Sequence, residues 1–305
     1  MNSKNEIFSK LSLRSKKSVA IIGSSLCSCL IGDYIKKKYG AKVVFYEEKK
    51  FIGGAWRIDG YGNMFSNIIA PTDQNTRKVF NKALIFLKNK KIQIKNLNQN
   101  SFYANQIVDT HIFNFNNFFN KIKKEYLFRR LKVKSLIEKE ECVLVNNEYM
   151  HDYVLFPNSV NFKISKKKSS LTKIFKLPKC KIIKSKHIRI ISKGISKEKL
   201  GGLNYSEQKL GPIDRLQIMK IRKNFFKISA RISKEYKRKS KNSIIKNLIE
   251  LLGIKNILDS SVSSYSSINY TSEQIKEINK INKNFNRIKH YNTSNIIGFI
   301  SEYLL

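Results

Sequence analysis

The stretch that most constrains the fold is VAIIGSSLCSCLIGDYI, residues 19–35. An apolar run ends at Gly23, and apolar residues then recur at helical spacing until Gly40, which suits a helix C-cap. A second apolar run, AKVVFYEE at residues 41–48, ends in two carboxylates. A strand, a tight turn, a helix and a strand within about thirty residues are typical of a βαβ unit with two parallel strands.

The turn of this unit is similar to G-x-G-x-x-G, the template that holds a dinucleotide pyrophosphate. Gly23 keeps the first glycine, whereas Ser25 and Ser28 replace the second and third. Ser25 places a Cβ near the pyrophosphate but adds a hydroxyl donor, and Ser28 is small enough for close packing of helix on strand. The helix N-terminus still offers N–H groups to an anion. Glu47 follows Gly23 by 24 residues, close to the spacing at which an acid binds a ribose hydroxyl.

Two other interpretations of this stretch compete with a nucleotide site. Residues 18–32 are uncharged and follow two lysines, as in a signal peptide, and Leu26–Cys29 is similar to a lipoprotein cleavage box around Cys29. Alternatively, Ser25 is the nucleophile of a G-x-S-x-G elbow, although nothing in the sequence places a histidine and an acid beside it. The helix and second strand that continue the pattern favour the βαβ interpretation.

The motif GGAWR begins at Gly53, six residues after Glu47. Together, residues 19–56 resemble the N-terminal FAD-binding segment of the amine oxidase and UDP-galactopyranose mutase class of flavoproteins, in which an acid ends the second strand and a Gly-Gly pair follows. The Gly-Gly-x-Trp form is also similar to flavin-containing monooxygenases. The resemblance implies that Gly23, Ser25 and Ser28 line the pyrophosphate, that Glu47 binds the adenosine ribose, and that Gly53, Gly54, Trp56 and Arg57 lie along the phosphate and isoalloxazine side of the flavin.

Residues 131–157 predict two strands, a turn at Asn146–Asn147 and a further strand over 152–156. This segment resembles the β-meander of the same flavoproteins and the strand that returns to their parallel sheet. The resemblance implies that the backbone of Val133 contacts the adenine. Taken alone, the segment fits an ordinary antiparallel hairpin equally well, and the N-terminal βαβ unit favours the flavoprotein arrangement.

One motif of those families is missing near the C-terminus. Their Gly-Asp pair binds the ribityl chain and phosphate, whereas this chain closes with NTSNIIGFISEYLL. We therefore expect weak binding of FAD, with adenine nucleotides, NAD(P) among them, competing for the site, since each lost charge-assisted contact costs about 1.5–3 kcal/mol.

The predicted fold class is α/β, a Rossmann-like FAD/NAD(P)-binding domain with a β-meander and a second, substrate-type α+β region. Residues 17–70 and 131–160 are expected to form the dinucleotide-binding domain. Residues 71–130 and 161–305 are expected to form the substrate-type region, behind a disordered basic lead at residues 1–16.

Amphipathic patterns place the elements of the second region. One helix is expected after Pro71–Thr72, with Val79, Ala83, Phe86 and Leu87 on its buried face. Residues 179–193 alternate as a basic strand, residues 242–253 form a helix that stops at Gly253, residues 258–271 form a serine-rich loop, and a last helix covers 272–285. A further helix is expected over residues 115–130. Its aromatic stripe is expected to face the core, which is favoured over base stacking: Phe115, Phe118, Phe119, Ile122 and Tyr126. Asp214 and Arg215 fit a structural ion pair better than a substrate contact.

The chain carries 60 basic and 22 acidic residues, a net charge of +38. Such a charge attracts phosphate-bearing cofactors and substrates as well as nucleic acids. The abundance of lysine, asparagine and isoleucine also matches A- and T-rich codons, so the charge alone assigns no partner. The leading hypothesis is an FAD- or NAD(P)-dependent oxidoreductase acting on an amine or a sugar nucleotide. The alternative is a non-catalytic nucleotide- or nucleic-acid-binding protein on a degenerate Rossmann scaffold.

The cysteines and histidines indicate no metal site. Cys27, Cys29, Cys142 and Cys180 form no C-x-x-C pair, and the four histidines are scattered. Reduced thiols in a cytoplasmic protein are the expected state. The sequence shows no transmembrane span, and no general acid, general base or nucleophile can be named from it.

Overall fold

The computed structural model describes residues 16–53, 58–59, 62–63, 67–69, 71, 73–97, 101–103, 106–107, 110–158, 162–168, 171–178, 181–196, 205–206, 209–222, 224–293 and 296–305. The basic lead up to residue 15, together with Gly54, Trp56, Arg57 and Cys180, lies outside the described residues.

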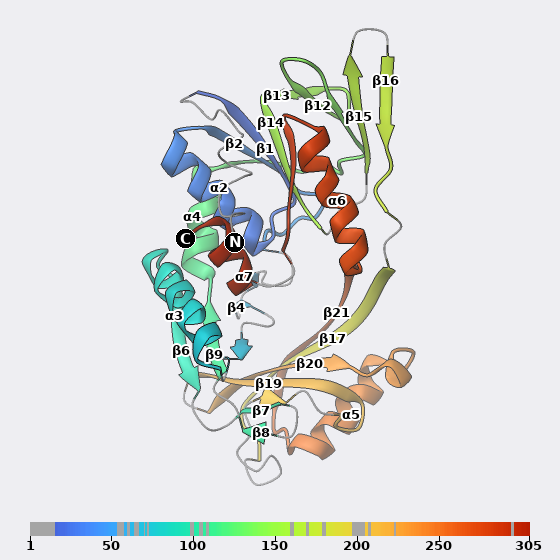
Figure 1. Ribbon diagram of the computed structural model, residues 1–305. Coiled ribbons are helices and arrows are strands. Elements are labelled where there is room, and N and C mark those ends of the chain that lie inside the picture. The colour runs from blue at the N-terminus through green and yellow to red at the C-terminus, as the bar shows by residue number, and fades with distance from the viewer. Residues whose placement is uncertain are drawn as a thin grey trace.

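A parallel sheet of five strands forms one end of the molecule (Figure 1), and its strand order is β10-β2-β1-β14-β22. The strands are β1 (Ser18–Ile22), β2 (Lys42–Tyr46), β10 (Leu127–Arg129), β14 (Tyr153–Pro157) and β22 (Ile288–Tyr291). Each pairs in parallel with its neighbours, and helix α2 (Leu26–Tyr39) connects β1 to β2. The predicted βαβ unit is confirmed. Two of the strands, β10 and β22, come from outside the ranges expected for this domain.

The packing of α2 on the sheet follows from its residues. Leu30, Ile31 and Ile35 are fully buried, and Gly40 ends the helix in the left-handed conformation, with φ 64°. Gly32 permits close contact with the sheet, because a Cβ built there would lie 2.5 Å from Cζ of Phe45.

The meander packs next to the parallel sheet. A second sheet has the order β13-β12-β11-β15-β16, and in it β11 to β13 pair antiparallel while β15 runs parallel to β11. Asn146 and Asn147 have φ of 53° and 62°, and the N–H of Glu148 donates to the carbonyl of Val145 at 3.1 Å, as in a type I′ turn. The segment expected to contain two strands before β14 contains three. The strands are β11 (Ser135–Glu138), β12 (Val143–Val145), β13 (Tyr149–His151), β15 (Lys163–Lys168) and β16 (Leu171–Phe175).

A seven-stranded sheet forms the other end of the molecule, with the order β21-β17-β20-β19-β18-β7-β8 (Figure 1). The predicted loop over 258–271 is wrong, because these residues form a strand, β21, paired antiparallel along the whole of β17. A serine-rich segment shows no apolar alternation, and serine has no strong preference for strands. The strand can therefore be recognised only from the strand with which it pairs. The strands are β7 (Ser101–Tyr103), β8 (Gln106–Ile107), β17 (Lys181–Ser192), β18 (Tyr205–Ser206), β19 (Ile213–Arg222), β20 (Phe225–Ile232) and β21 (Ile257–Asn269).

The remaining elements are helices and short strands around these sheets. They are α3 (Gln74–Asn89), α4 (Asn116–Glu125), the 3₁₀ turn η3 (Lys234–Tyr236), α5 (Lys241–Leu252), α6 (Ser272–Asn284), α7 (Ile296–Tyr303), and the strands β3 (Ile58–Asp59), β4 (Gly62–Asn63), β5 (Asn67–Ile69), β6 (Gln93–Leu97) and β9 (Thr110–Asn114). The aromatic stripe of α4 is buried as expected. On α3 the expected face is confirmed at Ala83 and Leu87, which are fully buried. It is wrong at Val79, which is 37% exposed, and Phe80, 2% exposed, is buried instead.

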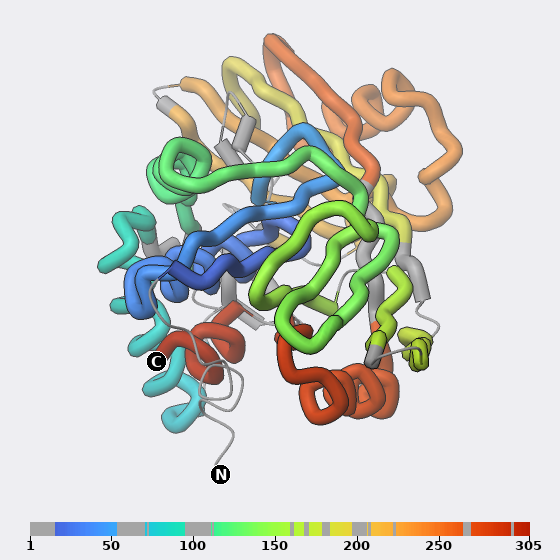
Figure 2. The backbone as a smooth tube through the Cα atoms, turned by 90° about the horizontal axis from the view of Figure 1, so that it is seen from above, coloured from blue at the N-terminus to red at the C-terminus, as the bar shows by residue number. Residues whose placement is uncertain are grey.

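Apolar residues cover the parallel sheet on both faces. One core joins it to α2, α3, α4 and α7, and a second joins its other face to the meander and α6. The last helix, α7, lies beside α3 (Figure 2). A third core lies between the seven-stranded sheet and α5. Among the helices that the structure describes, none is long and apolar enough to cross a membrane.

Candidate functional site

The turn after β1 is built around Gly23. Its φ is 81°, a conformation that side-chain-bearing residues rarely adopt, and its N–H donates to the carbonyl of Tyr46 at 2.7 Å. The nearest atom to a Cβ built at Gly23 is Cγ of Pro157, at 4.0 Å. The glycine therefore closes the turn, and a Cβ at this position would be strained by φ rather than by lack of space.

Ser24 and Glu47 join the turn to the end of β2. The N–H and the hydroxyl of Ser24 both donate to Oε2 of Glu47, at 2.9 and 2.7 Å. The other carboxylate oxygen accepts from the N–H of Lys49 at 2.8 Å. The predicted acid thus lies at the turn. Ser24, which is fully buried, was missed by sequence reasoning, although its position directly after Gly23 was the available signal.

Gly53, the first glycine of the pair after β2, lies against the same turn. The N–H of Gly53 donates to the carbonyl of Ser24 at 2.6 Å, and Gly53 forms a parallel bridge with Ser25. The structure therefore brings Gly53 together with Gly23 and Glu47. The other residues expected along the flavin, Gly54, Trp56 and Arg57, lie outside the described residues.

Ser25 is the N-cap of α2. Its φ of −60° and ψ of 167° are open to any residue, so no conformational requirement for glycine exists here. Its hydroxyl accepts from the N–H of Ser28 at 3.3 Å and lies 2.9 Å from the Ser28 hydroxyl. The first N–H groups of a helix have no backbone acceptor within it, so those of α2 that precede Ser28 lie beside the turn.

Ser28 points toward β22. It is fully buried, and the phenol of Tyr291 donates to its hydroxyl at 2.9 Å. Burial raises the pKa of Tyr291 and keeps its phenol protonated as a donor. Ser28 therefore links two elements of the domain, and the predicted close packing at this position holds.

The backbone before Val133 runs along the same edge of the sheet as Glu47. The N–H of Glu47 donates to the carbonyl of Arg129 at 3.0 Å, and the N–H of Leu131 donates to the carbonyl of Glu47 at 3.1 Å. Val133 lies two residues further on, and its side chain is buried against the meander. Val133 therefore follows a backbone segment that is hydrogen-bonded to Glu47.

A hydrogen-bonded group of side chains, most of them asparagine amides, lies at the carboxyl ends of β14 and β22. Asn158 donates to Asn292 at 2.7 Å, and the N–H of Asn292 donates to the phenol of Tyr303 at 3.3 Å. The ring nitrogens of His290 contact Asn279 and Asn158. Burial lowers the pKa of His290 to about 3, so its imidazole is neutral at pH 7. No motif in the sequence signalled this group.

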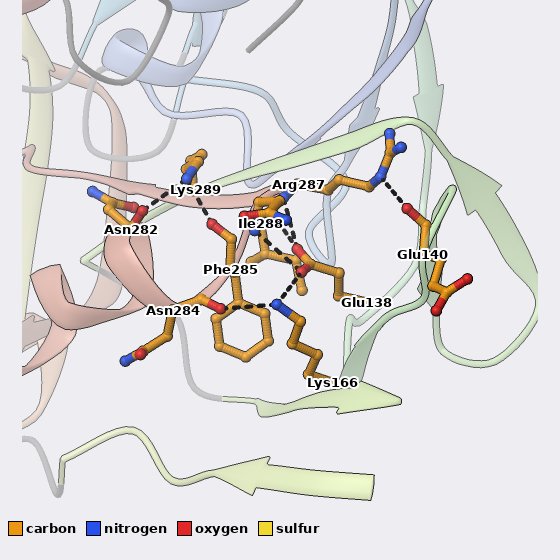
Figure 3. A network of polar contacts seen from close by, with 10 residues as sticks. Glu138, Glu140, Lys166, Asn282, Asn284, Phe285, Arg287, Ile288 and Lys289 are labelled. Carbon is orange, nitrogen blue, oxygen red and sulfur yellow. Dashed lines mark hydrogen bonds and ion pairs between the residues drawn. The ribbon is translucent and has the colours of Figure 1, made fainter. Parts of the chain in front are cut away.

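Glu138 fixes the position of β22. This carboxylate, 2% exposed, accepts from the N–H groups of Asn286, Arg287 and Ile288 at 3.1, 2.7 and 3.1 Å (Figure 3). In the same figure Lys289 donates to two carbonyls at the end of α6. Through these hydrogen bonds the meander fixes the position of β22 along its own axis in the parallel sheet, and therefore also the position of Tyr291.

The competing interpretations of residues 18–32 do not fit this geometry. Cys29 is fully buried within α2, between two strands of one sheet, and the Ser25 hydroxyl caps a helix. Burial raises the pKa of Cys27 to about 12 and that of Cys29 well above its ordinary value, so both remain thiols. Within the described ranges, no group of three or more His, Cys, Asp or Glu side chains is placed to hold a metal.

No protein-family model and no curated protein matches the sequence. Solved structures do match. A candidate protoporphyrinogen oxidase from Exiguobacterium sp. 255-15 has a TM-score of 0.60 at 7% identity, over 95% of this chain and 97% of that chain. Putrescine oxidase in a structure with bound putrescine has a TM-score of 0.62 at 9% identity, over 95% and 97%. The chain therefore shares the fold of these two oxidases, and an α/β fold with a Rossmann-like parallel sheet and a meander is the one that the sequence predicted.

Proposed function

We propose that this protein is an oxidoreductase that binds FAD at the carboxyl edge of the five-stranded sheet. The observation that carries the proposal is the convergence of Gly23, Glu47 and Gly53 on one turn, through the hydrogen bonds of Ser24. Open α/β sheets bind ligands outside the carboxyl ends of their strands, which is where this turn lies.

The residues present fit the adenosine half of FAD. The tight turn at Gly23 and the N–H groups at the start of α2 suit the pyrophosphate, because a helix N-terminus attracts anions. Glu47 suits the ribose hydroxyls, and the backbone at Val133 suits the adenine. Gly53, Gly54, Trp56 and Arg57 are assigned to the flavin side. Bound FAD would supply a two-electron acceptor, and these residues would bind and orient it.

The same contacts support weak rather than tight binding. Glu47 already accepts three hydrogen bonds, so a ribose hydroxyl must share the carboxylate or displace the Ser24 hydroxyl. Ser25 and Ser28 direct their hydroxyls at each other. Losing one charge-assisted bond of about 1.5–3 kcal/mol weakens affinity roughly ten- to hundredfold. Adenine nucleotides, including NAD(P)H, would then compete with FAD.

The sequence analysis left two classes of substrate open, amines and sugar nucleotides. Putrescine oxidase, whose structure holds putrescine, supports an amine by similarity of fold. The basic charge of this chain supports a phosphate-bearing substrate.

The test is a titration of flavin-free protein with FAD, in which binding is measured by the quenching of flavin fluorescence. Glu47→Gln removes the charge of the proposed ribose ligand, and Glu48→Gln removes a neighbouring, exposed charge as the matched control. We expect saturable binding that ADP displaces, weakened about tenfold or more by Glu47→Gln and unchanged by Glu48→Gln. Equal affinity in all three proteins would contradict the assignment of Glu47, and no saturable binding would contradict the function.

A further inference from the structure

One segment of the chain carries positive charge and no acidic residue. Residues 153–197 contain 13 lysines and arginines, whereas all 22 acidic residues of the chain lie outside them. The segment includes β15 and β16, which pair antiparallel as a hairpin, and β16 is the edge strand of its sheet. Figure 1 shows this hairpin at one extremity of the molecule, beside α6. The hairpin therefore carries basic charge that no carboxylate of its own segment neutralises.

One face of the hairpin packs against the rest of the protein. Side chains alternate between the two faces of a strand. On this inner face Ile164 is fully buried, and the rings of Phe175 and Phe285 lie 4.5 Å apart. Lys166, on the same face, lies 3.4 Å from Glu138 and donates to the carbonyl of Asn284 at 3.2 Å. The inner face is thus occupied by α6 and the meander.

The outer face of the hairpin is exposed and basic. Lys163 and Lys167 lie on it at either side of Ser165, whose register partner on β16 is Ile174. Lys176 follows Ile174 by two residues, and all three lysines are exposed. Among the described residues, none of these lysines forms an ion pair with a carboxylate. Ile174 is 64% exposed, so the outer face presents an aliphatic side chain among three lysines.

A second aliphatic side chain is exposed at the free end of the hairpin. Leu171, at the start of β16, is 78% exposed, more than any other large apolar residue that the structure describes. Isolated apolar residues on a surface are ordinary. Leu171 and Ile174, however, lie three residues apart on an edge strand and beside lysines on both strands. Removal of such side chains from water is favourable, so this end of the hairpin suits a partner that is apolar and anionic.

Two features of the hairpin disfavour a nucleic acid or another protein strand as that partner. The aromatic residue of the hairpin, Phe175, packs on Phe285, so it cannot stack on a base. Lys173 lies in the middle of the edge strand, where a lysine opposes the addition of a further strand. In a second copy paired antiparallel about this position, the two Lys173 side chains would face each other and repel.

We propose that the β15–β16 hairpin binds the surface of an anionic membrane. The lysines of the outer face contact the anionic headgroups, and Leu171 and Ile174 enter the boundary between headgroups and acyl chains. Lysine suits this position because its aliphatic stem can lie along apolar surface while its ammonium group stays among the headgroups. Each lysine near such a surface strengthens binding about fivefold. The proposal goes beyond the proposed oxidoreductase function and does not depend on it.

The test is co-sedimentation of the full-length protein with lipid vesicles, with and without FAD. One set of vesicles contains phosphatidylcholine alone, and the other also contains about 30% phosphatidylserine. We expect binding to the anionic vesicles to be tighter by about tenfold or more, and to weaken as NaCl screens the charges. Equal binding to both sets, or no binding to either, would overturn the proposal. Absence of flavin binding would leave it standing, so the two proposals fail independently.

Variants of the hairpin separate its two contributions. Lys167→Gln combined with Lys176→Gln should weaken binding to the anionic vesicles about tenfold or more. Leu171→Ser combined with Ile174→Ser should also weaken it about tenfold or more, because it removes the apolar side chains. All four side chains are exposed, so the midpoint of thermal unfolding should stay that of the wild type.

Matched controls change exposed residues elsewhere. Lys239→Gln combined with Lys246→Gln removes two lysines at or just before α5, which lies at the opposite end of the molecule (Figure 1). Ile85→Ser combined with Ile249→Ser removes two exposed aliphatic side chains from α3 and α5. Both controls should bind as the wild type does, and an equal loss in either would overturn the proposal. So would tighter binding to single-stranded RNA than to the vesicles, or a dimer in solution that Leu171→Ser combined with Ile174→Ser dissociates.

Discussion

The phenol of Tyr291 on β22 donates a 2.9 Å hydrogen bond to the hydroxyl of Ser28 on α2, across 263 positions of sequence. Both residues are fully buried. The serine that replaces the third glycine of the dinucleotide motif therefore connects the first helix of the domain to its last strand.

Restoring the glycine should destabilise the protein. Ser28→Gly leaves the Tyr291 hydroxyl buried without its acceptor, at about 1–3 kcal/mol, and adds about 1 kcal/mol for glycine inside a helix. Urea unfolding should show a loss of about 2–4 kcal/mol in the free energy of unfolding. Tyr291→Phe in the Ser28→Gly background should recover part of this loss, because it removes the orphaned hydroxyl. A Ser28→Gly variant as stable as the wild type would refute the link.

Glu138 should matter to stability more than its neighbour Glu140. Glu138→Gln replaces one of the two accepting carboxylate oxygens by an amide nitrogen, which donates and cannot accept an N–H group, so we expect a loss of about 2–4 kcal/mol in the free energy of unfolding. Glu140→Gln changes an exposed side chain and should stay within about 0.5 kcal/mol of the wild type. Equal stability of the two variants in urea unfolding would show that Glu138 does not hold β22.

Stability should fall in mild acid, in part through His290. Its pKa is lowered from 6.5 to about 3 in the folded protein, so between these pH values the unfolded chain binds a proton that the folded chain does not. The free energy of unfolding therefore keeps its full value above pH 6.5 and declines as the pH falls toward 3, by up to about 1.4 kcal/mol per pH unit for this group. His151 and His187 act in the same direction.

The measurement for His290 is the difference between two pH profiles. His290→Gln cannot take up the proton, so its urea-unfolding profile from pH 7 to pH 5 should be shallower than that of the wild type, even though the variant is less stable at pH 7. Parallel profiles would mean that folding does not lower the pKa of His290.

The elements that could be predicted from the sequence are those whose buried residues are apolar and recur at helical or strand spacing. The βαβ unit and the buried face of α4 are examples. The burial of Val19, Phe118 and their neighbours can be predicted from the spacing of apolar residues along the chain, without knowing which element packs against them. The turn residues Gly23 and Glu47 were found because the chemistry of a dinucleotide turn fixes their spacing.

The elements that the sequence missed carry polar residues satisfied by distant partners. In β22, Lys289 and His290 are buried. An argument from apolar periodicity predicts that such polar residues are exposed to solvent. They are tolerated because Lys289 donates to carbonyls of α6 and His290 contacts amides of α6 and β14. Likewise β21 is a strand because β17 pairs with it, and Asp214 meets Arg231 across the sheet.

Hydrogen exchange with and without FAD, followed by mass spectrometry of peptides, tests the central claim most directly. The account predicts that FAD slows exchange in three separated segments, around residues 22–30, 45–53 and 129–134, which meet at the carboxyl edge of the parallel sheet. Slower exchange confined to the seven-stranded sheet, or no change in any of these segments at FAD concentrations that saturate binding, would contradict it.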